Sequence, residues 1–163
     1  MDYLWTPWRY RYIADASKDV GCIFCEALAV NDDARTLIVL RGTKAFVILN
    51  LYPYTIGHMM VVPYEHIATL EAASAGTLEE MILLAQRAQR HLREIYRSPG
   101  FNIGMNLGES AGAGIAGHIH LHVLPRWPGD TSFITTIAET RVLPEDLPAT
   151  WRKLREAFGQ ASV

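Results

Sequence analysis

Three histidines alternate with apolar residues in His118-Ile119-His120-Leu121-His122, a segment that holds half of the six histidines in the chain. If this segment is a strand, successive side chains point to opposite faces, so the three imidazoles share one face. Alternate residues lie about 6.6 Å apart along a strand, which places the outer two rings about 13 Å apart. Such a row suits a series of ligand atoms better than one metal ion bound by all three rings.

Three interpretations of the histidine segment are open. It could be the polar face of an edge strand, although Lys, Thr or Glu usually fill such positions. It could be a three-histidine metal site, although the spacing is poor for one. Nucleophilic catalysis is favoured, because a neutral imidazole, with an ordinary pKa of about 6.5, can attack phosphorus without a separate base.

A glycine- and alanine-rich loop, residues 108–117, leads directly into the histidine segment. Because its side chains are small, backbone N–H groups at 108–114 could approach phosphate oxygens and stabilise developing charge. The alternative is a flexible connector.

The composition restricts the class of protein. The chain has 163 residues, fits one domain and carries a formal net charge of −2, without the Lys/Arg excess of a nucleic-acid-binding surface. It shows no signal-peptide pattern and no run of roughly 20 apolar residues, so neither nucleic acid nor membrane is an expected partner. The cytoplasm follows as the default location.

Residue periodicity predicts an α+β domain. Apolar residues at helical spacing from Leu78 to Ile95 indicate one long amphipathic helix, with Thr77 and Glu80 as a capping box and Pro99-Gly100 as its stop. A terminal helix is expected at 145–158. The histidine strand would pack its apolar face, Ile119, Leu121 and Val123, against the long helix. Extended runs predict an antiparallel sheet with strands at 36–40, 45–51, 58–62, 101–107, 118–124 and 133–137.

The pattern His-x-His-x-His-x-x-Pro-Arg, with Asn50-Leu51-Tyr52-Pro53-Tyr54-Thr55-Ile56-Gly57-His58 upstream, resembles the histidine triad (HIT) superfamily. It is most similar to bacterial diadenosine tetraphosphate phosphorylases, and also to fragile-histidine-triad dinucleoside polyphosphate hydrolases. The resemblance implies one five-stranded antiparallel sheet with a long and a C-terminal helix, dimerising into a ten-stranded sheet. A homodimer or higher homo-oligomer is therefore expected. Residues 1–163 would form a single HIT domain with an arm at 1–19, a core at 20–137 and a helical segment at 138–163.

The resemblance also implies catalytic roles. His120, the middle histidine, would attack the α-phosphorus of a nucleotide and form a covalent nucleotidyl intermediate. His122 would hydrogen-bond the phosphate, and His58 would support the cluster from a neighbouring strand. No organic cofactor is expected.

Further positions match substrate contacts of the family. Asn50 corresponds to a ribose-binding residue and Asn106 to a polar residue beside the phosphates. The phosphate loop would include Gly112, Ala113 and Gly114. Trp127 could stack on a nucleobase, although packing in the core or at a dimer interface is a close alternative.

One departure from the family pattern bears on whether water or inorganic phosphate attacks the nucleotidyl intermediate. The hydrolases carry a Gln and a Ser or Thr in the loop where this chain has Ala113, Gly114 and Ile115. A small residue there would leave room for inorganic phosphate in place of water, which favours a phosphorylase.

The only two cysteines, Cys22 and Cys25, form a Cys-x-x-Cys motif. In a reducing compartment this spacing indicates a redox pair or half of a metal site. The motif is similar to the zinc knuckle of some HIT proteins, in which the other ligands correspond to His66 and His118. That resemblance implies a closed tetrahedral structural zinc site. The alternative is two reduced cysteines in the core and a surface His66.

The expected function is cleavage of dinucleoside polyphosphates, with diadenosine tetraphosphate favoured and phosphate or water resolving the intermediate. One alternative is a nucleoside phosphoramidate hydrolase (an adenosine 5′-phosphoramidase) of the same superfamily. Another is a non-catalytic nucleotide-binding regulator.

Overall fold

The computed structural model describes residues 21–131, 135 and 143–160. The five strands are β1 (Ile38–Arg41), β2 (Ala45–Leu49), β3 (Met59–Pro63), β4 (Gly100–Gly104) and β5 (Leu121–Arg126). The α-helices are α2 (Ile23–Ala29), α3 (Asp33–Thr36), α4 (Ala75–Tyr96) and α6 (Leu147–Gln160), and the 3-10 turns are η1 (Leu70–Ala72) and η2 (Glu109–Ala111). The expected arm at 1–19 and all of the expected strand 133–137 except Thr135 lie outside the described residues.

The strands form one sheet in the order β1-β2-β3-β5-β4, with every neighbouring pair antiparallel. The expected five-stranded antiparallel sheet is therefore confirmed. β5, which carries His122, pairs with β3 on one side and β4 on the other, where His122 lies opposite Met60 and Gly104. His122 thus lies in the strand next to the central strand of the sheet.

Two expected strand starts were wrong. The run 36–40 begins with a helical turn, because Asp32 accepts a hydrogen bond from the Arg35 N–H and caps α3, and Leu37 then turns the chain with a φ of 64°. The histidine strand begins at Leu121 instead of His118. There the Ile119 N–H donates to the Ile67 carbonyl, outside the sheet.

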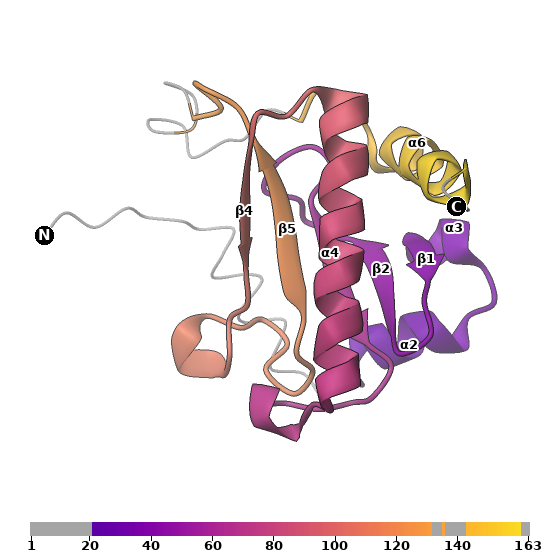
Figure 1. Cartoon of the computed structure of the whole chain (residues 1–163), viewed down its shortest axis with the longest axis vertical. Coiled ribbons are helices and arrows are strands. Elements are labelled where there is room, and N and C mark those ends of the chain that lie inside the picture. Colours follow the sequence, from indigo (N-terminus) through magenta and orange to yellow (C-terminus); the bar gives the residue numbers. More distant parts are fainter. Residues whose placement is uncertain (1–20, 132–134, 136–142, 161–163) are drawn as a thin grey trace, which may run out of the picture.

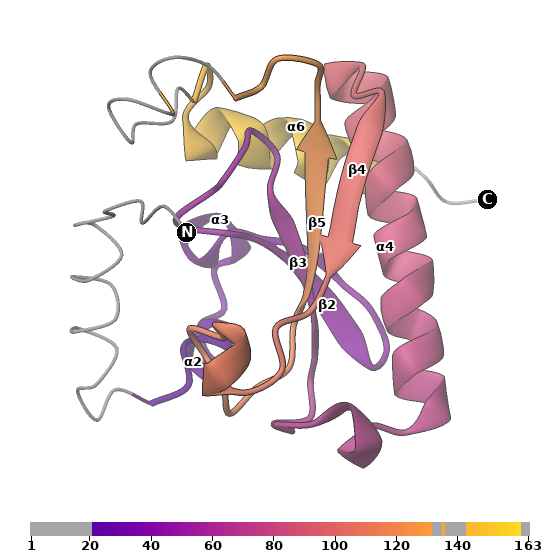
Figure 2. The same cartoon turned by 90° about the vertical axis from the view of Figure 1, so that its left-hand side faces the viewer.

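The sheet separates two apolar cores, with α4 on one face and α2 on the other (Figure 2). Leu121 and Val123 pack with Met81 and Leu92 of α4, which confirms the expected apolar face for these two residues. The second core, beneath α2, gathers Phe24, Ile38, Phe46, Ile48, Met60 and Val62. The polar side chains of β5 therefore face the α2 side of the sheet.

The long helix α4 begins before the expected capping box. Ser74 is the N-cap, and its hydroxyl accepts a hydrogen bond from the Thr77 N–H at 3.1 Å. The carboxylate of Glu80 instead accepts from the backbone of the β1–β2 turn, at the Thr43, Lys44 and Ala45 N–H groups. The capping-box prediction was therefore wrong, since Glu80 holds a tertiary contact. Arg97, in the left-handed region with a φ of 51°, ends the helix just before Pro99-Gly100, as expected.

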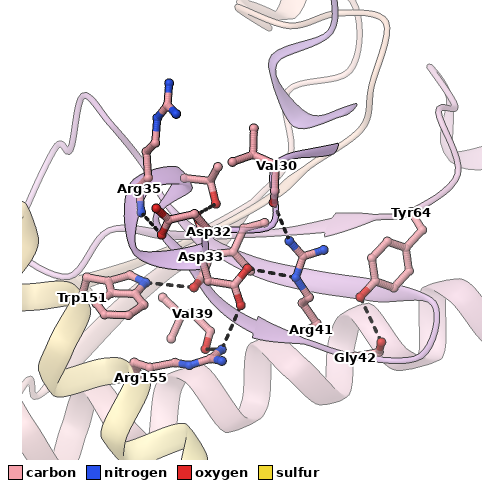
Figure 3. Close-up of polar contacts among 12 residues, drawn as sticks. Val30, Asp32, Asp33, Arg35, Val39, Arg41, Gly42, Tyr64, Trp151 and Arg155 are labelled. Carbon is pink, nitrogen blue, oxygen red and sulfur yellow. Dashed lines mark hydrogen bonds and ion pairs between the residues drawn. The ribbon is translucent and has the colours of Figure 1, made fainter. Parts of the chain in front are cut away.

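The outer edge of β1 is covered by α6 (Figures 1 and 3). The Trp151 indole N–H donates to the Ile38 carbonyl and the Arg155 guanidinium to the Val39 carbonyl, each at 2.8 Å. α6 starts two residues later than expected, and Glu145 accepts a hydrogen bond from the Tyr96 hydroxyl. Among the described helices, none is long and apolar enough to cross a membrane.

Candidate active site and metal centre

Four histidine rings form a cluster: His122 lies in β5, His58 directly precedes β3, and His118 and His120 precede β5. His118, His120 and His58 are buried, and His122 is half-buried. The ring centroids of His120 and His122 are 4.9 Å apart, and those of His122 and His58 are 5.1 Å apart. The structure therefore brings together the three residues for which catalytic roles were expected.

Backbone geometry determines which nitrogen of His58 carries the proton. The Tyr54 N–H, which can only donate, lies 3.2 Å from Nδ1, and the Asn50 amide nitrogen lies 3.3 Å from the same atom. Nδ1 is therefore the acceptor, and the proton of the neutral ring is on Nε2. This Nε2–H donates to Nδ1 of His122 at 2.9 Å, so His122 in turn carries its proton on Nε2.

The tautomer of His120 is determined in the same way. Its Nδ1 lies 2.9 Å from the backbone carbonyl oxygen of His118, which can only accept. The proton of the neutral ring is therefore on Nδ1, and Nε2 carries a lone pair. A neutral imidazole held in one tautomer with Nε2 unprotonated can act as a nucleophile.

Burial keeps the rings of His120 and His122 uncharged near neutral pH. It lowers the pKa of His120, against a smaller opposite effect of the hydrogen bond to the His118 carbonyl. Burial, and after it the nearby His120, lowers the pKa of His122 from 6.5 to about 4. The cluster therefore pairs an unprotonated nitrogen on His120 with an N–H donor on His122.

The loop before the histidine segment is folded on itself. Its turn η2 follows Gly108 (φ 79°), and the Ala111, Gly112 and Ala113 N–H groups donate to carbonyls of Gly108 and Glu109. Those three N–H groups are therefore engaged within the loop. The Asn106 amide donates to the Gly112 carbonyl at 3.5 Å, which links the end of β4 to the loop.

Two other expected contact residues differ in position. Asn50 lies at the cluster, where its amide nitrogen contacts His58 and its carbonyl oxygen accepts from the Tyr52 N–H. Trp127 lies beyond the opposite end of β5, about 16 Å along the strand from His122, and its indole donates to the Tyr96 carbonyl. The structure therefore brings Asn50 but not Trp127 to the histidines, and the Trp127 contact favours the packing alternative.

Cys22, Cys25, His66 and His118 form a candidate metal-binding group, since their ligand atoms all lie within 4.8 Å of one another. The His118 Nε2–H donates to the Pro63 carbonyl at 2.9 Å, which leaves Nδ1 for a ligand. This Nδ1 lies 3.2 Å from Cys22 Sγ, and His66 Nδ1 lies 3.4 Å from Cys25 Sγ. Two thiols and two imidazoles at these separations fit a tetrahedral thiophilic ion. Unrelated cysteines in a core would not be expected to converge with His66 in this way.

Two aromatic residues beside the cluster were missed. Tyr54 lies over His58 with ring centroids 4.9 Å apart, and Phe24 contacts both His118 and His120. Phe24 is one of the two intervening residues of the Cys-x-x-Cys motif. If Cys22 and Cys25 bind a metal together with His118, Phe24 must lie near the histidine segment. The Cys-x-x-Cys motif could therefore have predicted the position of Phe24.

An antiparallel sheet with this histidine cluster, preceded by a glycine-rich loop, defines the histidine triad class of proteins. Residues 31–129 match the HIT domain family. The chain is 42% identical over 159 residues to the AP-4-A phosphorylase of Mycobacterium tuberculosis, covering 93% of this chain and 81% of that relative. The chain therefore belongs to the HIT family. This confirms the resemblance found in the sequence and, with it, the expectation of an enzyme.

Solved structures agree with the fold. A Zn-bound histidine triad family protein from Mycobacterium smegmatis matches with a TM-score of 0.70 and 33% identity, over 86% of this chain and 94% of that one. The diadenosine triphosphate hydrolase of Plasmodium falciparum matches with a TM-score of 0.65 and 15% identity, over 80% of each chain. The second match concerns the fold alone.

Proposed function

We propose that this enzyme cleaves dinucleoside polyphosphates, with diadenosine tetraphosphate as the favoured substrate, by double displacement through His120. The observation that carries the proposal is the 2.9 Å contact between His120 Nδ1 and the His118 carbonyl oxygen, from which we infer that Nδ1 carries the proton and Nε2 is unprotonated. The 42% identity to an AP-4-A phosphorylase supports the choice of substrate.

In the first step, Nε2 of His120 forms a bond to the α-phosphorus. The bond from that phosphorus to its bridging oxygen breaks, and the electron pair leaves with the remaining nucleotide. The positive charge that develops on the ring is stabilised by the Nδ1–H bond to the His118 carbonyl, already in place before the reaction. The Nε2–H of His122 donates to a phosphate oxygen, and His58 keeps His122 in the donor tautomer.

In the second step, an oxygen of inorganic phosphate or water attacks the nucleotidyl-histidine, and His120 leaves as a neutral imidazole. We favour phosphate, because Ala113, Gly114 and Ile115 place small or apolar side chains in the loop where hydrolases carry Gln and Ser or Thr. Asn106, Gly112, Ala113 and Gly114 remain our proposed phosphate-side residues, but Gly112 and Ala113 would contribute their small size, since their N–H groups donate within the loop. Asn50 remains our proposed ribose contact, in addition to its contact with His58.

The products of diadenosine tetraphosphate turnover test the proposal. With phosphate present, ADP plus ATP is expected, whereas AMP plus ATP would mean that water resolves the intermediate. Turnover of an adenosine phosphoramidate without cleavage of diadenosine tetraphosphate would replace the proposal with a phosphoramidase. Nucleotide binding without turnover of either compound would leave only a regulator.

We further propose that the Cys22, Cys25, His66 and His118 group holds Zn²⁺. The ion would be structural, because four protein ligands complete its coordination. It would tie α2 to the segment that precedes β5. Elemental analysis of untagged protein should give close to one zinc per chain, and Cys25→Ser should lower both the zinc content and the melting temperature. A folded, active enzyme without zinc would contradict this.

We also propose a homodimer that pairs two β4 strands, extending the sheet to ten strands. The β1 edge is occupied by contacts from α6, whereas β4 forms the other edge and its Ile103 is 43% exposed. Light scattering should give a dimer for the wild type and a monomer for Ile103→Lys. The control Leu70→Lys, at an exposed position in η1, should remain dimeric. A monomeric wild type would refute the dimer.

A further inference from the structure

Phe24 joins the Cys-x-x-Cys helix to the histidine cluster. It is the one buried residue of α2, with a relative exposure of 1%, and it lies between Cys22 and Cys25. The Phe24 side chain belongs to the core that also contains Phe46, Ile48 and Met60. The position of the ring is therefore determined both by the sheet and by the cysteine segment.

The same ring contacts two histidines. Its centroid lies 5.4 Å from that of His118 at an interplanar angle of 79°, and 5.2 Å from that of His120 at 50°. Both distances lie within the range of favourable aromatic pairs. The His122 ring makes an edge contact with the His120 imidazole at 4.9 Å and 75°. The His120 ring is thus contacted by both Phe24 and His122.

The contacts with Phe24 restrict the rotation of the His120 ring about χ2, which the hydrogen bond to the His118 carbonyl alone restricts only weakly. The χ2 torsion of a histidine is broad, so the ring can rock about its attachment to Cβ while the Nδ1–H stays close to its acceptor. Rocking would move Nε2 most, because it is on the far side of the ring. A flat ring packed against the imidazole limits that movement, whereas a flexible aliphatic side chain would limit it less.

We propose that Phe24 is a positioning residue that holds the His120 imidazole in its reactive orientation and tautomer, and links it to the Cys22–Cys25 segment. The inference rests on the proposed role of His120 as nucleophile. A residue with only a core-packing role would contribute to stability and leave the orientation of His120 unchanged.

The test compares Phe24→Leu with Phe46→Leu. Both variants shorten a buried phenylalanine of the same core, but Phe46 stacks on Tyr64 and lies on β2, which β3 separates from β5 and His122. Phe24→Leu should lower kcat about 10-fold or more with KM nearly unchanged, because small misplacements of a reacting group are costly. Phe46→Leu should lower the melting temperature by a similar amount and keep kcat close to that of wild type. If Phe24→Leu does not fold, Phe24→Met takes its place.

A second readout does not require turnover. Long-range ¹H–¹⁵N NMR should show one His120 tautomer, protonated at Nδ1, in the wild type and in Phe46→Leu, and mixed or shifted ring signals in Phe24→Leu at unchanged zinc content. Equal kcat losses in the two variants, or wild-type His120 signals in Phe24→Leu, would overturn the inference. If the wild type does not cleave diadenosine tetraphosphate, the proposed function fails separately, and the NMR comparison still tests Phe24.

Discussion

Substitutions at His58 separate two roles of that ring. Its Nδ1 accepts from the Tyr54 N–H, and its Nε2–H donates to His122. A glutamine amide nitrogen falls near the position of Nε2, whereas an asparagine amide falls near Nδ1. His58→Gln should therefore keep a donor to His122. His58→Asn should keep an acceptor for Tyr54 but leave His122 Nδ1 without its partner.

The size of the effect follows from the environment of His122. Leaving a half-buried acceptor without its donor costs about 1–2 kcal/mol, which corresponds to roughly a 5- to 30-fold change in rate. We expect His58→Asn to lower kcat for diadenosine tetraphosphate by that factor, with KM nearly unchanged because His58 is not proposed to contact the substrate. His58→Gln should lie within a few-fold of wild type.

Steady-state kinetics of both variants, with melting temperatures as a control, provide the assay. The relay from His58 to His122 is refuted if the two variants lose kcat equally at equal stability. It is also refuted if His58→Gln is the more impaired variant.

Three further predictions concern pH and stability. The acid limb of the kcat–pH profile should lie below pH 6.5, because burial lowers the pKa of the nucleophile His120 and of His122, and activity is lost as His120 or His122 becomes protonated. Burial likewise lowers the pKa of His91, so its contribution to stability is present above pH 6.5 and is lost as the pH falls below that value. In His91→Leu, the melting temperature should therefore fall less between pH 7 and pH 5 than it does in the wild type. Glu80→Ala should lower the free energy of unfolding by about 2 kcal/mol, because three backbone N–H groups lose their carboxylate acceptor. The neighbouring exposed Glu79→Ala should stay within about 0.5 kcal/mol of wild type in urea unfolding, and equal losses would refute that role for Glu80.

The spacing of apolar residues in the sequence predicted the long helix and the sheet face that packs against it. The apolar alternation around Leu121 and Val123 indicated the sheet face that packs on α4, and the helical spacing from Leu78 to Ile95 indicated α4 itself. The start of α4 was misplaced because Thr77 and Glu80 match a capping box locally, while Glu80 in fact binds a turn far away in sequence. Propensity alone could not distinguish these two uses of one carboxylate.

The candidate site divides in the same way. The spacing of the histidines and the family pattern indicated His120, His122 and His58, but the protonation of each ring depends on a backbone group. His120 takes its tautomer from the His118 carbonyl and His58 from the Tyr54 N–H. Such contacts depend on the conformation of the turns before β3 and β5, which the alternation of polar and apolar residues does not predict. The contact of Phe24 with His120 likewise required the position of α2 relative to the sheet.

The central claim is that a nucleotidyl group forms on Nε2 of His120. The most direct measurement is peptide mapping by mass spectrometry after an alkaline quench of diadenosine tetraphosphate turnover in phosphate-free buffer, with His120→Ala as the control. We predict a single adenylate on the peptide that contains residues 118–122, assigned by fragmentation to His120 and absent from the variant. An adenylate on another residue, or none at any time during turnover that proceeds normally, would contradict the account.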